Sequence, residues 1–194
     1  RIREPIFICS LPRAGTTLLL EIISRLPGIA THRYRDMPLI MAPLLWQAIS
    51  SRVHKRASLK ERAHGDGMLV GYDSPEAFEE VLWSLYWPHK YQADHIAMWS
   101  KDDLSDEFNK ALVEHMQKII ALRAPEQSGT WRYASKNNAN IARLEFIKRL
   151  IPDAMIVVPF RHPLDHAASM LRQHKLFLER HRLDAFSKKY MHDI

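Results

Sequence analysis

The chain has 194 residues, which is enough for one domain with a hydrophobic core of its own. Hydrophobic residues make up 46% and charged residues 26% of it, as is typical of a soluble globular protein, and we expect neither a membrane span nor a signal peptide. The formal net charge of +6 favours an anionic partner.

Charge and cysteine content bear on the partner and the location. Lysine and arginine are scattered, with small clusters only at 52–62 and 172–189, and no recognition-helix, zinc-finger or RNA-binding motif occurs. Such clusters are typical of a solvated surface, so we expect no nucleic-acid partner. The single cysteine, Cys9, excludes an intramolecular disulfide and suits a reducing compartment, so we expect a cytoplasmic protein.

The first predicted elements are a strand, a turn and a helix. The run 6–10 is apolar and β-branched, which predicts a buried strand, and apolar residues at 18, 19, 22, 23 and 26 predict a helix. Between them lies a turn with Arg13 and Gly15, followed by Thr16 and Thr17. A turn at a helix N-terminus presents backbone N–H groups to an anion. The sequence therefore predicts a site for a phosphorylated ligand; the alternative is an ordinary turn.

The turn differs from the loop of nucleoside triphosphatases, G-x-x-x-x-G-K-[ST]. Ser10 stands at the first glycine position, and Thr16 replaces the lysine that follows the second. The remaining cation, Arg13, precedes Gly15. The lysine that contacts the β- and γ-phosphates is therefore missing.

Helices and strands alternate along the rest of the chain. Helices are predicted at 37–53, 74–86, 105–121, 139–150 and 163–181, strands at 131–135 and 154–160, a loop at 54–67 and a turn at 126–129. Ser74, Pro75 and Glu76 form a helix-start pattern, and Glu79 and Glu80 are expected to face solvent. The pattern predicts an α/β fold with a mostly parallel sheet flanked by helices.

Cations follow three of the predicted strands. Arg13, Lys136 and Arg161 each come where a strand ends, and ligands of parallel sheets bind at the carboxyl ends of the strands. Arg161 suits a phosphate, and Ser169 lies about a turn and a half into the next helix, so its hydroxyl could reach the same group. The alternatives are a surface salt bridge for Arg161 and a packing role for Ser169.

Two of these segments resemble motifs of the sulfotransferases that use 3′-phosphoadenosine 5′-phosphosulfate. The segment 12–17, Pro-Arg-Ala-Gly-Thr-Thr, is similar to the family's 5′-phosphosulfate loop, and 160–169 is similar to its 3′-phosphate motif. Lys136 is similar to a lysine of the tyrosylprotein-type and bacterial members. The resemblance implies a P-loop-like three-layer fold and donor contacts from a set of residues: Arg13, Ala14, Gly15, Thr16, Thr17, Arg161 and Ser169.

The chain departs from the family pattern in two places. Asn137 and Asn138 replace the usual proline-containing form after Lys136. Family members usually continue beyond the point where this chain ends, with a segment that covers the nucleotide. We therefore expect residues 1–194 to form a single sulfotransferase-like domain that lacks its C-terminal part.

The resemblance implies direct sulfuryl transfer to a hydroxyl or amine, with adenosine 3′,5′-bisphosphate as product. Arg13 and Lys136 would stabilise the charge that develops on the leaving phosphate, and no metal is expected. Asp36 and His32 are candidates for the base, and the family favours Asp36, whose alternative role is helix capping. The acceptor stays open among lipid, sugar, small molecule and peptide.

Two other functions stay open from the sequence. One is a kinase or nucleoside triphosphatase, against which the missing loop lysine counts. The other is an inactive nucleotide- or nucleic-acid-binding domain, which the positive charge would suit.

Overall fold

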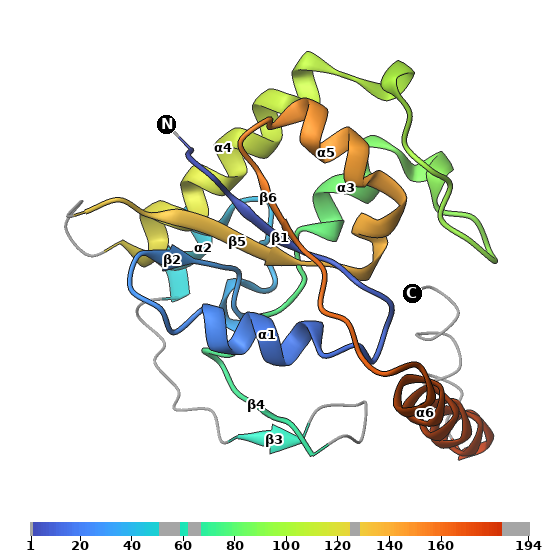
Figure 1. The fold of residues 1–194 in the computed structure, drawn as a ribbon. Helices are drawn as coiled ribbons and strands as arrows, with labels where there is room; N and C mark the ends of the chain where they lie inside the picture. The colour runs from blue at the N-terminus through green and yellow to red at the C-terminus, as the bar shows by residue number, and fades with distance from the viewer. Residues whose placement is uncertain (1, 51–58, 62–66, 125–128, 184–194) are drawn as a thin grey trace.

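Four parallel strands form the central sheet of the computed structural model, which describes residues 2–50, 59–61, 67–124 and 129–183 (Figure 1). The strands are β1 (Ile6–Ile8), β2 (Ile29–Ala30), β5 (Arg132–Lys136) and β6 (Met155–Val157). Their order is β2-β5-β1-β6, and Ile8 lies opposite Lys136 and Val157. The predicted α/β fold with a parallel sheet is confirmed.

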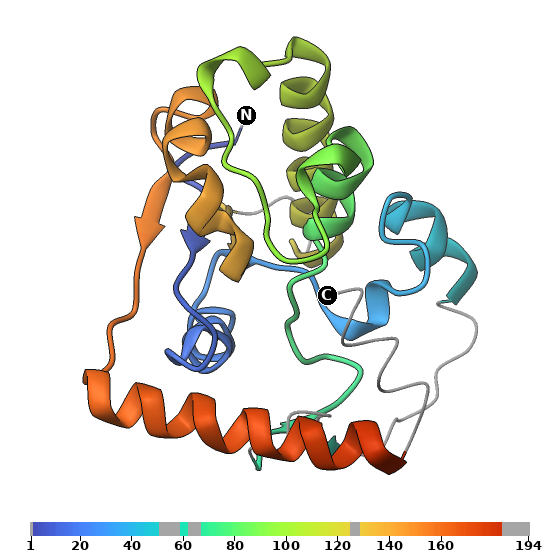
Figure 2. The ribbon, with the colours of Figure 1, turned by 90° about the vertical axis from the view of Figure 1, so that its right-hand side faces the viewer.

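Helices cover both faces of this sheet. The α-helices are α1 (Thr16–Ile23), α2 (Pro43–Ser50), α3 (Glu80–Tyr86), α4 (Asp106–Arg123), α5 (Leu144–Leu150) and α6 (Pro163–Leu183). Short 3-10 helices occupy Tyr34–Asp36, Pro88–Lys90, Lys101–Asp103 and Asn138–Arg143, and β3 (Lys60–Glu61) pairs with β4 (Leu69–Val70). Helix α6 runs along the side of the molecule that carries α1 (Figures 1 and 2). No helix in the described part is long and apolar enough to span a membrane.

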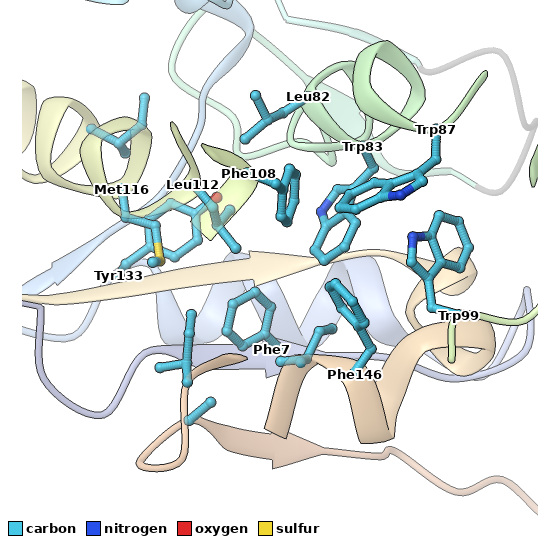
Figure 3. Close-up of a cluster of buried hydrophobic side chains, with 14 of the residues drawn as sticks. Phe7, Leu82, Trp83, Trp87, Trp99, Phe108, Leu112, Met116, Tyr133 and Phe146 are labelled. Carbon is cyan, nitrogen blue, oxygen red and sulfur yellow. The ribbon is translucent and has the colours of Figure 1, made fainter. Parts of the chain in front are cut away.

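Alternation along β1 divides the core between the two faces. Ile6 and Ile8 pack with Leu20 of α1 on one face, whereas Phe7 joins the larger cluster on the other, because successive side chains of a strand point to opposite faces. That cluster contains aromatic residues from several elements, including Trp83 and Phe146 (Figure 3). The rings of Trp83 and Phe108 lie 4.5 Å apart between their centroids. This packing fixes α3, α4 and α5 over the sheet.

Several predicted boundaries are wrong. The helix predicted from Ser74 begins only at Glu80, because Pro75 forms an antiparallel bridge with Arg33 and the N–H of Glu76 donates to the carbonyl of His32. The helix predicted at 37–53 begins at Pro43, which fits a first turn rather than kinking the helix. The strand predicted at 154–160 ends at Val157, shortly before Pro159, which has no N–H for a ladder.

The expectation that Glu79 and Glu80 face solvent is also wrong. Glu79 is fully buried, where it accepts hydrogen bonds from the Nε1–H of Trp83 at 2.8 Å and from the hydroxyl of Tyr133 at 2.6 Å. Glu80 pairs with the buried guanidinium of Arg143. Both carboxylates therefore link α3 to other parts of the fold.

Other predicted elements are found with small shifts. Ser105 caps α4 as predicted, since its hydroxyl accepts the N–H of Phe108 at 3.2 Å. The helix predicted at 139–150 begins as the 3-10 helix Asn138–Arg143 and continues as α5. The predicted loop at 54–67 and turn at 126–129 lie mostly outside the described residues.

Candidate functional site

The turn between β1 and α1 has an unusual backbone. Arg13 has φ +70° and Gly15 has φ +96°, both in the left-handed region. A Cβ at Gly15 would meet nothing within 4 Å, so conformation rather than space favours glycine there. Helix α1 has neither a side-chain cap nor an acidic residue in its first turn. Its N-terminus can therefore favour an anion.

The turn contacts the segment that follows β6. The hydroxyl of Ser10 donates to the carbonyl of Pro159 at 2.9 Å. The Nε–H of Arg13 donates to Oγ of the buried Ser169 at 3.2 Å, and the guanidinium of Arg161 donates to the carbonyl of Arg13 at 3.4 Å. The structure thus brings together the two predicted anion-binding segments.

Lys136 is the last residue of β5, so it lies at the same carboxyl edge of the sheet as the turn that follows β1. It is opposite Ile8 in the register, so its side chain leaves the sheet near the point where β1 enters the turn. A cavity of about 310 Å³ lies here. Its lining combines basic, hydroxyl and apolar residues with one acid: Pro12, Arg13, Gly15, Thr16, Thr17, Leu18, Met68, Glu76, Lys136, Asn138, Arg161 and Gln173.

Most of the predicted site residues meet at this cavity. Six of them line it, namely Arg13, Gly15, Thr16, Thr17, Lys136 and Arg161. Ala14 and Ser169 do not line it, although Ser169 holds the side chain of Arg13. Three basic side chains, those of Arg13, Lys136 and Arg161, give the cavity a positive lining suited to a ligand with several negative charges.

Asp36 is not brought to this cavity. It is buried at the end of the 3-10 helix Tyr34–Asp36, where one oxygen accepts the N–H of Arg33 at 2.8 Å and the other accepts from Arg123 at 2.7 Å. These contacts favour the capping and structural role that the sequence left open. A role of Asp36 as base stays a prediction.

His32, the second candidate base, is also buried away from the cavity lining. Its Nε2 lies 3.0 Å from Nε2 of His115, and the two rings are stacked. Burial, His115 and Arg123 hold the pKa of His32 well below its usual value. Burial and Lys118 lower the pKa of His115 to about 4, against the opposite effect of Asp36. Two neutral rings satisfy this contact, one donating and one accepting.

Glu76 is a charged cavity residue that the sequence analysis did not assign to the site. Its Oε1 lies 3.2 Å from Nζ of Lys136. Burial raises the pKa of the Glu76 carboxyl. Lys136 and the hydrogen bonds from Ala77 and Tyr34 together lower it by more than burial raises it, so the pKa lies below its usual value. In the sequence, Glu76 reads only as an acid in a helix first turn, and nothing there pairs it with a lysine 60 positions away.

No metal site emerges from the described residues, because they contain no group of three or more histidine, cysteine, aspartate or glutamate residues placed to hold a metal ion. The lining of the cavity is likewise poor in metal ligands, with Glu76 as its one carboxylate. Metal independence stays a prediction that chelation can test.

Comparisons with known proteins agree with the sequence resemblance. The model of the sulfotransferase family matches residues 5–194. The structure is similar to that of sulfotransferase STF9 from Mycobacterium avium, with a TM-score of 0.51 and 19% identity over 91% of this chain and 47% of that one. Sulfotransferase STF1 from Mycobacterium tuberculosis H37Rv gives a TM-score of 0.45 and 17% identity, over 83% of this chain and 46% of that one.

The chain thus spans about half the length of these solved structures. No curated protein matches the sequence.

Proposed function

Because the chain belongs to the sulfotransferase family, we propose that it transfers a sulfuryl group from 3′-phosphoadenosine 5′-phosphosulfate to a hydroxyl or amine acceptor. The observation that carries the proposal is the contact between the two motif segments, where Arg13 donates to Ser169 and Arg161 donates to the carbonyl of Arg13. One cavity then serves both anionic ends of the donor.

The chemistry of the lining fits such a donor. Arg13, Lys136 and Arg161 supply positive charge, and Thr16 and Thr17 supply hydroxyl groups at a helix N-terminus. The volume of about 310 Å³ is at the lower end of the range for small-molecule pockets, roughly 300–1,000 Å³. In this proposal Arg161 and Ser169 serve the 3′-phosphate, and the turn 13–17 serves the phosphosulfate.

The bound donor supplies an activated sulfuryl group with a phosphate as leaving group. Arg13 and Lys136 act on the negative charge that develops on the leaving phosphate, and removal of one such donor typically lowers the rate on the order of a hundredfold. Asp36, the base that the sequence predicts, is buried and paired with Arg123 away from the cavity, so its role as base stays a separate prediction. We also propose a cytoplasmic location, because the single cysteine, the buried Cys9, suits a reducing compartment.

Calorimetric titration tests the proposal directly. Adenosine 3′,5′-bisphosphate should bind at least tenfold more tightly than AMP or ATP, because only the bisphosphate engages both motif segments. Its affinity should be the same in EDTA as in magnesium. Preferential binding of magnesium-ATP would favour a kinase or nucleoside triphosphatase and contradict the proposal.

A further inference from the structure

Glu76 is out of place in an anion-binding cavity. Among the described residues that line the cavity it is the one acidic side chain, beside the cations Arg13, Lys136 and Arg161. A carboxylate there opposes the binding of phosphate or sulfate by like-charge repulsion. Its position therefore calls for a role other than contact with the anion.

Three hydrogen bonds hold the Glu76 carboxylate. Its Oε1 accepts from the N–H of Ala77 at 2.8 Å and from Nζ of Lys136 at 3.2 Å, and its Oε2 accepts from the hydroxyl of Tyr34 at 2.8 Å. The Glu76 N–H also donates to the carbonyl of His32 at 3.2 Å. Two of these contacts, from Ala77 and Tyr34, fix the carboxylate independently of the lysine.

Lys136 is restrained mainly by this carboxylate. Its side chain is only 12% exposed, and its ammonium group pairs with Glu76. A lysine side chain has several rotatable bonds, so an anchored carboxylate at its tip fixes where the charge lies. An incoming anion must share the ammonium with Glu76 or draw it away.

We propose that Glu76 is a positioning residue, which holds the ammonium of Lys136 in the cavity and competes with the anionic ligand for it. The inference rests on the proposed function for the identity of the ligand, but the competition itself concerns any anion in this cavity. Loss of the carboxylate then has two opposite effects. Anions bind more tightly, because one negative charge is gone, and sulfuryl transfer slows, because Lys136 is no longer fixed.

The matched variants are Glu76→Gln and Glu145→Gln. Both remove one negative charge, but Glu145 lies on α5 with 78% of its side chain exposed, and it pairs with Arg149 on the same helix. Calorimetric titration with adenosine 3′,5′-bisphosphate and with inorganic pyrophosphate should give about fivefold tighter binding for Glu76→Gln. Glu145→Gln should stay within twofold of the wild type, since a distant exposed charge is screened.

The outcomes separate this inference from the proposed function. Unchanged or weaker binding of both anions to a folded Glu76→Gln protein overturns the competition. Binding of pyrophosphate but not of the bisphosphate overturns the proposed function, whereas the comparison of variants with pyrophosphate still tests Glu76. Failure of the wild type to bind either anion overturns both.

A charge-conserving variant distinguishes competition from a merely structural role. Glu76→Asp keeps the negative charge on a shorter side chain, so its affinity for the bisphosphate should stay within twofold of the wild type. A structural role predicts instead that both Glu76 variants lose affinity together with thermal stability. That result, measured by calorimetry and by melting temperature, would contradict the proposal.

Discussion

Arg13 and Ser169 lie 156 positions apart in the sequence, yet the Nε–H of Arg13 donates a hydrogen bond to Oγ of Ser169 at 3.2 Å. Arg13 belongs to the turn after β1, and Ser169 is a buried residue of α6. The backbone of Arg13 is in the left-handed region, and Ser169 of α6 holds its guanidinium in place. It joins the two segments that the sequence analysis singled out.

Removal of the Ser169 hydroxyl should weaken ligand binding without unfolding the protein. Ser169→Ala deletes one hydrogen bond to a charged group, worth about 1.5–3 kcal/mol. We expect affinity for adenosine 3′,5′-bisphosphate to fall about tenfold in calorimetry. The control is Ser84→Ala, which deletes an exposed hydroxyl that donates to the carbonyl of Val81 within α3. Equal affinity of both variants would remove the role of the Arg13–Ser169 contact.

Two glycines should differ in their response to alanine. Gly15 and Gly28 both have positive φ, which costs an L-residue about 1–2 kcal/mol. A Cβ at Gly28 would also lie 2.8 Å from the carbonyl oxygen of Thr130, whereas one at Gly15 meets nothing within 4 Å. In urea denaturation we expect Gly28→Ala to lose more unfolding free energy than Gly15→Ala. The reverse order would contradict the geometry of these turns.

The buried histidine pair should make stability depend on pH. Burial and Lys118 lower the pKa of His115 to about 4, while an unfolded histidine titrates near about 6.5. Between these values the unfolded chain binds a proton that the folded chain does not. The contribution of His115 to the unfolding free energy is therefore fully present above about pH 6.5. It is lost as the pH falls toward 4, and the loss amounts to at most about 3 kcal/mol.

A variant tests the assignment of this pH dependence. His115→Gln keeps a hydrogen-bonding group beside His32 but does not titrate. Urea unfolding at pH 7 and pH 5 should show a smaller loss of unfolding free energy for the variant than for the wild type. An identical loss in both proteins would assign the dependence to other groups.

Asp36→Asn separates the two roles of Asp36. Asparagine can still accept the N–H of Arg33, but it leaves the buried Arg123 without its anionic partner. Since breaking a buried ion pair typically costs about 3–5 kcal/mol, we expect a clear loss of unfolding free energy in urea, with bisphosphate affinity retained by the folded protein. Unchanged stability together with lost sulfuryl transfer would instead support Asp36 as base.

The sequence could predict three of the four strands of the sheet, all but β2, and half of the residues that line the cavity, because these depend on short, local patterns. Arg13 and Arg161 follow buried apolar runs, and parallel strands bring their carboxyl ends to one edge. The carboxylates could not be placed in this way. Glu79 binds Tyr133 from 54 positions away, and Glu76 binds Lys136 from 60, so burial and pairing arise only when distant segments pack.

The central claim is that one cavity holds both anionic ends of the nucleotide, with Arg161 at the 3′-phosphate. Calorimetric titration of Arg161→Ala with adenosine 3′,5′-bisphosphate and with AMP tests it most directly. The account predicts that affinity for the bisphosphate falls at least tenfold, while affinity for AMP, which has no 3′-phosphate, changes less than threefold. Equal weakening of both ligands, or no change in either, would contradict it.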